Sequence, residues 1–277
     1  MTKTNFTKMH GCGNDFIYFN QDFPNPGELS IRLSHRNKSI GGDGIVLITP
    51  SEIADAKMRM YNADGSEGLM CGNSVRCVGK YLHDHGMVDS LQITIETSSG
   101  IKHLTLIEEN GEITAARVDM GRVELSPEKI PVNLTGAMVV ARKVEIAGNP
   151  YEITCVSMGN PHAIIFHDDI DHFELSTVAA AFETSDLFPK GINLGVVQMI
   201  KRNHMRMHVW DRGTGEIMAS GTGACAAAVA AVLMGYSDKD TDIQVEVRGG
   251  ILTIKYTDET VYMTGDCVTI YEGTVQI

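Results

Sequence analysis

Two stretches of the chain place a small nucleophilic residue at the expected start of an apolar helix. One runs Glu67-Gly68-Leu69-Met70-Cys71-Gly72-Asn73-Ser74, and the other runs Glu216-Ile217-Met218-Ala219-Ser220-Gly221-Thr222-Gly223. The first backbone N–H groups of a helix have no intrahelical acceptor, and the helix dipole favours negative charge there. We therefore expect Cys71 to ionise readily, whereas Ser220 carries a hydroxyl at the matching place.

Two such helix starts, if they face each other, would form a cleft that binds a carboxylate through backbone N–H groups. The α-carboxylate of an amino acid fits this description. A thiolate beside it would face the α-carbon, and the surrounding donors would stabilise the enolate-like charge formed when the α-proton leaves. An isolated Cys-Gly pair would favour a buried structural cysteine, but the many polar residues near Cys71 favour a ligand cleft. These polar residues are Asn62, Asp64, Ser66, Glu67, Asn73 and Ser74.

Composition excludes several function classes. The chain has 277 residues, of which 43% are apolar, which allows one large domain or two of ordinary size. The net charge is −12 and no run of lysine or arginine interrupts it, so nucleic acid is not an expected partner. The longest apolar stretch, residues 224–234, is too short to cross a bilayer, so we expect no membrane association and a soluble cytoplasmic protein. Six scattered cysteines indicate reduced thiols, and we expect no metal site.

Hydrophobic periodicity predicts many strands and few helices. Asn110-Gly111 is the strongest hairpin signal, because both residues tolerate positive φ. The expected helices are 28–35, 73–85, 173–182 and 223–234; the last is nearly all alanine and valine and should be buried on every side. The expected strands are 16–19, 45–48, 58–61, 91–97, 102–107, 113–120, 144–147, 152–157, 163–166, 194–200, 205–210, 243–247 and 251–256.

The two helix starts belong to a longer internal similarity. Gly13-Asn14 precedes Gly159-Asn160, and Gly44 precedes Gly195, by nearly the same offset that separates Cys71 from Ser220. Three similarities in one order suggest two halves with a common topology. The alternative is ordinary turn punctuation, in which glycine only supplies positive φ.

At these residues the sequence closely resembles diaminopimelate epimerase, a cofactor-independent enzyme that interconverts LL- and meso-diaminopimelate on the lysine and peptidoglycan pathway. The resemblance is spread in family order over nearly the whole chain. It rests on residues 9–16 (MHGCGNDF), 62–67 (NADGSE), 71–73 (CGN), 157–162 (SMGNPH), 212–216 (RGTGE) and 221–226 (GTGACA).

The resemblance implies an α+β fold of two pseudo-symmetric domains, each a curled mixed or antiparallel β-sheet wrapped around a central helix. The domains would be 1–120 plus 266–277, and 121–265, with the active site between them and a final strand near 268–271 returning to the first domain. The implied reaction is a two-base 1,1-proton transfer at the α-carbon, with no cofactor. Homodimers are common among such enzymes, although composition does not fix the number of subunits.

The family's functional residues map onto this sequence one by one. Cys71 matches one of two catalytic cysteines, and Ser220 stands in place of the other. Gly72-Asn73 and Gly221-Thr222 match the backbone cradles for the α-carboxylate. The substrate-binding side chains are matched by Asn14, Asn62, Asn160, Asn193 and Arg212, and Arg212 can hold the distal carboxylate as a fork.

Three departures from the family pattern bear on turnover. Ser220 does not ionise near neutrality without a dedicated base. Asp211 stands where a glutamate usually precedes the arginine, which shortens the carboxylate expected to meet the distal amino group. Gly44 stands where some members place a glutamine.

Several accounts of Ser220 stay open at the level of sequence. The chain is a true epimerase with a deliberate Cys→Ser replacement and little or no turnover, or a single-thiol amino-acid racemase or β-eliminating lyase, or a non-catalytic amino-acid-binding protein. Proline, hydroxyproline or histidine are rival substrates, because relatives in the same broad fold act on them. Arg212, Asn62 and Asn193 favour a second carboxylate at the far end of the substrate.

Overall fold

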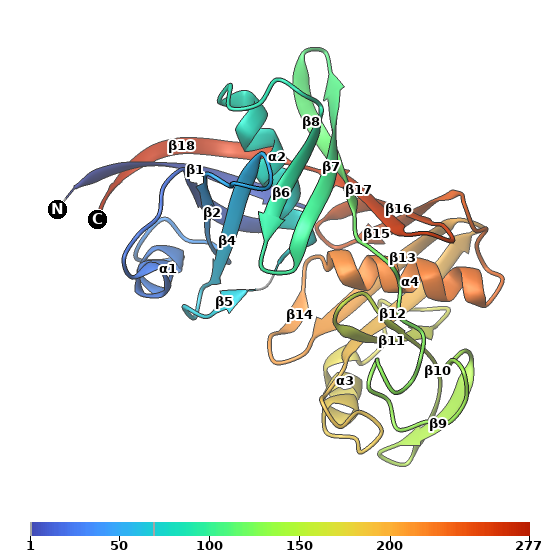
Figure 1. Cartoon of the computed structure of the whole chain (residues 1–277). Helices are drawn as coiled ribbons and strands as arrows, with labels where there is room; N and C mark the ends of the chain where they lie inside the picture. The colour runs from blue at the N-terminus through green and yellow to red at the C-terminus, as the bar shows by residue number, and fades with distance from the viewer. Residues whose placement is uncertain (1, 69) are drawn as a thin grey trace. The chain divides into compact units, whose positions relative to one another are not determined.

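The chain divides into two compact units in a computed structural model that describes residues 2–68 and 70–277. Unit 1 comprises Met1–Asp119 and Thr264–Ile277, and unit 2 comprises Met120–Met263 (Figure 1). Met1 and Leu69, the latter inside the first helix-start motif, lie outside the described residues. Each unit has its own helices and its own set of paired strands.

Unit 1 contains two helices, α1 (Pro26–Ser34) and α2 (Gly72–Asp84). Its strands are β1 (Lys3–Gly11), β2 (Asn14–Phe19), β3 (Gly44–Thr49), β4 (Ala56–Asn62), β5 (Glu67–Gly68), β6 (Gln92–Thr97), β7 (Gly100–Glu109), β8 (Glu112–Asp119) and β18 (Val268–Gln276).

Unit 2 contains α3 (Leu175–Glu183) and α4 (Gly221–Leu233). Its strands are β9 (Arg142–Ile146), β10 (Asn149–Ser157), β11 (Pro161–Phe166), β12 (Asn193–Lys201), β13 (His204–Asp211), β14 (Gly215–Ile217), β15 (Asp242–Val247) and β16 (Gly250–Tyr256). The boundary between the units falls within β17 (Val261–Asp266).

Both units repeat one order of strand pairing. In unit 1, β1 is antiparallel to β2, β2 is parallel to β3, β3 is antiparallel to β4, and β4 pairs antiparallel with β5 and parallel with β6. In unit 2, β10 to β15 follow the same scheme. Helices α1 and α3 connect the parallel strands, while α2 and α4 follow the short strands β5 and β14. The predicted α+β fold with a mixed sheet in each half is therefore confirmed.

Side-chain alternation explains how each sheet carries helices on both faces. Ile17 and Phe19 of β2 pack with Leu29 and Leu33 of α1 in one apolar cluster. Tyr18, between them, points to the opposite face, because successive residues of a strand alternate. Its hydroxyl donates to the Ser74 carbonyl oxygen of α2 over 3.3 Å.

The sheet of each unit curls around its second helix. Helix α2 packs against β1, β2, β6, β7 and β8, and α4 packs against β10 to β13, β15 and β16. Residues Ala224 to Ala231 of α4 are all fully buried, as the sequence predicts. The small side chains of α4 let strands approach the helix closely from several sides. This close packing fixes the position of the start of α4.

The turn and helix predictions agree with the structure, but four strands were not predicted: β1, β5, β14 and β17. Asn110 and Gly111 have φ of 54° and 83° and join β7 to β8, which confirms the hairpin. No strand was expected before residue 16, yet β1 (Lys3–Gly11) is a mostly buried strand. It pairs on both edges, with β2 and β18, and α2 packs against it, so the burial of β1 comes from tertiary pairing rather than from its hydrophobicity.

Within residues 2–68 and 70–277, no helix is long and apolar enough to cross a membrane.

Candidate active site

Cys71 is the N-cap residue of α2, with an extended backbone conformation and no side-chain capping bond. Its thiol is half-buried and lies 3.1 Å from the amide oxygen of Asn14, to which it donates. Because the side chain does not cap the helix, the sulfur is available for other chemistry. The N–H groups of Gly72 and Asn73 follow directly, at positions that have no acceptor inside a helix.

A buried arginine supports the first turn of α2. Arg76 is fully buried, and its guanidinium donates to the Gly72 carbonyl at 3.3 Å and to the Asn73 side-chain oxygen at 3.1 Å. It also donates to the Asp266 carbonyl at 3.1 Å and lies 3.8 Å from the Asp266 carboxylate. The Asn73 side chain is thereby used within the protein, so the backbone of Asn73 is the part that can serve a ligand. The role of Asn73 as part of a carboxylate cradle stays a prediction.

Asn62 lies at the end of β4, in a polar turn that leads to β5. Its side-chain amide donates to the Ser66 hydroxyl at 3.0 Å, and Ser66 in turn donates to the Asp64 carboxylate at 2.6 Å. These bonds shape the loop that precedes the first helix start. Among the described residues, no hydrogen bond joins Asn62 to Cys71, so the substrate role of Asn62 stays a prediction.

Ser220 is the N-cap residue of α4, in nearly the same backbone conformation as Cys71. Its hydroxyl oxygen accepts a hydrogen bond from the Gly223 N–H at 3.1 Å. Serine is among the best N-cap residues because its short side chain can satisfy one of the free N–H groups. The hydroxyl therefore has a structural partner that the Cys71 thiol lacks.

A buried histidine connects Asn160 to the start of α4. His162 Nε2 lies 3.1 Å from the Asn160 side-chain oxygen and 3.1 Å from the Thr222 hydroxyl, which is itself 3.5 Å from the Ser220 hydroxyl. Burial, and then the nearby charge of Arg212, lower the pKa of His162 to about 3. Its Nδ1 is buried and has no hydrogen-bond partner in the described part of the chain. The imidazole is therefore neutral near pH 7 and a weak base.

Asn193 begins β12 and Arg212 directly follows the adjacent strand β13, near this histidine. Asn193 pairs with His162 across β11 and β12, and its side-chain oxygen accepts from the Arg212 backbone N–H at 2.9 Å. The Arg212 guanidinium is exposed and donates to the Lys190 carbonyl. Burial raises the pKa of the neighbouring Asp211 carboxyl. Unit 2 thus brings Asn160, Asn193, Arg212, Thr222 and Ser220 into one connected cluster.

The glutamates that open both motifs have matching structural roles. Glu67 accepts from the Arg59 guanidinium at 2.9 Å, and Glu216 lies 2.9 Å from the Arg248 guanidinium. Each pair ties the short strand before the helix start to another strand or turn of its own unit. The repeated glutamate therefore anchors the loop that precedes each helix start.

Comparison with known proteins assigns the chain to a family. The sequence model described as diaminopimelate epimerase matches residues 6–126 and 154–270. A protein named diaminopimelate epimerase from Desulfovibrio desulfuricans is 49% identical over 97% of this chain and 96% of that protein. The chain belongs to the diaminopimelate epimerase family. Another member so named, from Methanococcus maripaludis, is 47% identical over 98% of this chain and 99% of its own length.

Solved structures agree on the diaminopimelate epimerase fold at low sequence identity. A phenazine biosynthesis protein of the PhzF family from Bacillus anthracis superposes with a TM-score of 0.72 at 16% identity, and the match covers all of both chains. At this identity the likeness concerns the fold alone.

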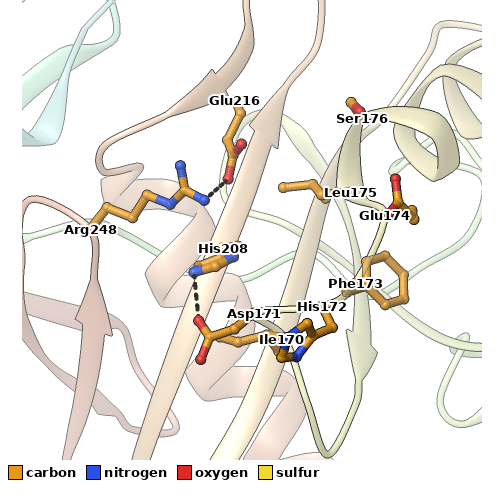
Figure 2. Close-up of a pocket in the computed structure, with 10 residues that line it drawn as sticks. All are labelled: Ile170, Asp171, His172, Phe173, Glu174, Leu175, Ser176, His208, Glu216 and Arg248. Atoms are coloured by element: carbon orange, nitrogen blue, oxygen red, sulfur yellow. Dashed lines mark ion pairs between the residues drawn. The ribbon is translucent and has the colours of Figure 1, made fainter.

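Unit 2 also has a cavity that contains none of the expected binding residues. It measures about 300 Å³ and is bordered by the 170–176 segment, His208, Glu216 and Arg248 (Figure 2). His208 lies on the face of β13 opposite to the buried methionines 205 and 207, because residues alternate along a strand. Asp171 is paired with Arg206 at 2.8 Å and Glu216 with Arg248 at 2.9 Å, so two of the carboxylates that line the cavity already have charged partners.

Sequence reasoning missed two residues that contact the predicted ones. Asp43 accepts from the Asn14 side-chain amide at 2.6 Å, and His162 contacts both Asn160 and Thr222. The signal for Asp43 was a single acidic residue within the glycine run at 41–44, where little side-chain bulk surrounds it. The signal for His162 was its place beside Asn160-Pro161, but burial and protonation state are not visible in a sequence.

Proposed function

We propose that this chain is a cofactor-independent epimerase that exchanges the α-proton of diaminopimelate through Cys71, and that its net epimerisation is slow because Ser220 replaces the second thiol. The main support is the 49% identity, over nearly the full length of both chains, to a protein named diaminopimelate epimerase. The thiol at the start of α2 supports the chemistry, because it lies at a helix N-terminus, where the first backbone N–H groups have no acceptor within the helix.

The proposed roles follow from the chemistry of each group. Cys71 removes or returns the α-proton. The backbone N–H groups at Gly72-Asn73 and Gly221-Thr222 bind the α-carboxylate and stabilise the enolate-like charge. The side chains of the second half bind the far end of the substrate, Arg212 its carboxylate and Asp211 its amino group. The amides of Asn14, Asn62, Asn160 and Asn193 complete the polar lining.

Ser220 is a poor substitute for a thiol in this setting. Its oxygen accepts from the Gly223 N–H, and the neighbouring Thr222 hydroxyl leads to His162. An imidazole with a pKa of about 3 cannot take a proton from serine at neutral pH. The second half therefore has no dedicated base, which supports one working acid–base group instead of two.

Restoring the thiol is the most specific test of this proposal. Ser220→Cys should raise the rate of LL-to-meso conversion by about 10²–10⁴, the usual contribution of one positioned acid–base group. The same variant should lose about 0.5–1 kcal/mol of stability, because cysteine caps the Gly223 N–H less well than serine does. Conversion is followed by chiral chromatography, and stability by urea unfolding.

The matched control is Ser176→Cys, the same substitution in the first turn of α3. This residue is exposed and borders the cavity of Figure 2, so the conversion rate should stay at the level of the unmodified chain. A Ser220→Cys protein that is folded but no faster than the parent would refute the role given to residue 220.

A further inference from the structure

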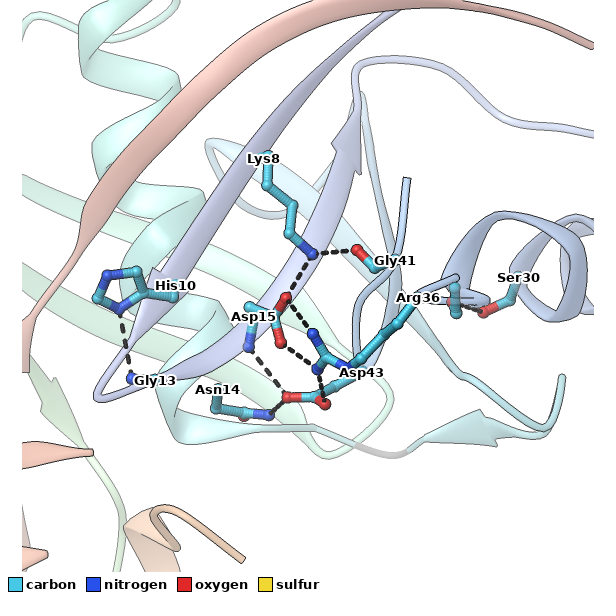
Figure 3. A network of polar contacts seen from close by, with 10 residues as sticks. Lys8, His10, Gly13, Asn14, Asp15, Ser30, Arg36, Gly41 and Asp43 are labelled. Atoms are coloured by element: carbon cyan, nitrogen blue, oxygen red, sulfur yellow. Dashed lines mark hydrogen bonds and ion pairs between the residues drawn. The ribbon is translucent and has the colours of Figure 1, made fainter. Parts of the chain in front are cut away.

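A carboxylate fixes the orientation of the amide that contacts Cys71. Asp43 Oδ2 accepts from Asn14 Nδ2 at 2.6 Å and from the Asp15 backbone N–H at 3.0 Å (Figure 3). An ionised carboxylate only accepts hydrogen bonds, so it must face the NH₂ side of the Asn14 amide. The Asn14 oxygen is thereby turned away from Asp43, toward the Cys71 sulfur at 3.1 Å.

Asp43 is itself held by a network of charges (Figure 3). Its second carboxylate oxygen lies 2.8 Å from the Arg36 guanidinium, and its backbone N–H donates to the Asp15 carbonyl at 2.7 Å. Arg36 also donates two hydrogen bonds to the Asp15 carboxylate, at 3.1 and 2.6 Å. Lys8, which is buried, lies 2.6 Å from the same carboxylate. Because both Asp43 oxygens have partners, the carboxylate cannot easily turn.

The elements place these groups together by the parallel pairing of β2 and β3. Asn14 begins β2, and Asp43 directly precedes β3. Phe16 pairs with Gly44 across the two strands, so the preceding residues of both strands lie at the same end. The start of α2, with Cys71, reaches this end from a separate part of the chain.

We propose that Asp43 is a positioning residue that acts through Asn14 on the Cys71 thiol. It keeps an acceptor, and not an N–H donor, against the sulfur, and so sets the direction of the S–H bond. The role of the thiol in catalysis rests on the proposed function, whereas the link from Asp43 to the sulfur does not. Without Asp43, the Asn14 amide can rotate and offer N–H to the sulfur, which favours attack by sulfur as a nucleophile.

Cys71 alkylation tests this link without any substrate. The rate of reaction with iodoacetamide at pH 7.5 is measured on the peptide that contains Cys71, by mass spectrometry. Cys71 is half-buried, whereas the other five cysteines are buried, so its signal is separable. Asp43→Ala should raise the rate about fivefold, the effect of roughly one hydrogen bond. In an Asn14→Ala background, the same substitution should change the rate less than about twofold.

The matched control is Glu96→Ala, which removes another carboxylate of unit 1. Glu96 is 2.8 Å from Lys57 and accepts from Ser51, outside the network around Asp43, so the Cys71 rate should not change. If Asp43→Ala does not fold, as judged by circular dichroism, Asp43→Asn replaces it and should give a smaller increase, because a neutral acceptor holds the amide less firmly.

Two outcomes would overturn the proposal. One is an unchanged Cys71 rate in folded Asp43 variants, and the other is an Asp43 effect of full size in the Asn14→Ala background. Failure of the proposed function looks different: the alkylation coupling would be present, but the unmodified chain would not exchange the α-hydrogen of diaminopimelate.

Discussion

Cys71 and Ser220 occupy the same position of two similar helix starts, but their side chains are used differently. The thiol leaves its helix uncapped and donates to Asn14, whereas the hydroxyl caps its own helix through the Gly223 N–H. Serine at position 220 therefore stabilises the start of α4, whereas the side chain of Cys71 leaves the start of α2 without a cap. Of the two side chains at these matching positions, only that of Ser220 caps its own helix.

His162 gives a pH prediction at the residue scale. Its pKa is lowered from 6.5 to about 3, so between these values the unfolded chain binds a proton that the folded chain does not. Stability should therefore fall as the pH falls from about 6.5 toward 3. Between pH 7.5 and pH 5.0 the loss due to this one group is about 2 kcal/mol.

Urea unfolding at both pH values checks this, with His162→Gln as the comparison. The variant is less stable at pH 7.5 because its partners Asn160 and Thr222 lose the imidazole. However, its loss between pH 7.5 and 5.0 should be smaller than that of the parent by about 2 kcal/mol. Equal losses in both proteins would show that His162 is not held neutral by the fold.

At the element scale, the repeated glycines have two different physical reasons. Gly13 and Gly159 have φ of 76° and 97°, in the turns that follow β1 and β10. Gly44 instead lies within β3, where a Cβ would come 2.0 Å from the Tyr61 carbonyl oxygen. Its counterpart Gly195 in β12 is crowded by the flexible Met207 and Ile164 side chains. One repeat signal thus reflects turns, and the other reflects close packing of strands.

Gly44→Gln should destabilise the protein, although some family members were expected to carry glutamine there. The atom that a side chain at position 44 would meet is the Tyr61 carbonyl oxygen of the backbone, so β3 would have to move away from β4 to make room. We expect this movement to cost about 1–3 kcal/mol or more of folding free energy. The midpoint of urea unfolding measures this loss. Thr49→Gln, at the other end of β3, is half-buried and should change stability much less. A parental midpoint for Gly44→Gln would contradict the crowding seen at this strand.

Sequence periodicity located the helices and most of the longer strands within a few residues, but it did not locate β17 (Val261–Asp266). Helix 73–85 was expected, and α2 spans Gly72–Asp84. The helix expected at 173–182 begins later, at Leu175, because apolar Phe173 extends the pattern without helical backbone. Strand β1 was missed because its apolar side chains, Phe6 and Met9, show no strict alternation. Its burial depends on partners distant in sequence.

The candidate site was predictable only where chemistry is local. Cys71 and Ser220 were placed at helix starts because a nucleophile, glycines and an apolar run are contiguous in sequence. The contacts of Asn14 with Asp43, and of His162 with Thr222, join separate strands and helices. Such pairs depend on strand register, which the residues of one segment do not determine.

At the scale of the whole molecule, the two units share one scheme of strand pairing, so a substitution in one unit need not alter the other. Each unit has the same strand pairing, and in each a short strand, β5 or β14, is followed by a helix, α2 or α4. Each of these two helices packs against strands of its own unit. A substitution at residue 220 therefore leaves unit 1, with Cys71 and its network, unaltered. We therefore expect the chain to retain one acid–base group, Cys71, and most of its binding groups.

Deuterium exchange tests this central claim most directly. The chain is incubated with LL-diaminopimelate in deuterated buffer, while mass spectrometry follows α-deuteration and optical rotation follows inversion. The account predicts α-deuteration that clearly exceeds inversion, and loss of the exchange in Cys71→Ser. Inversion as fast as deuteration, or exchange that persists in Cys71→Ser, would contradict it.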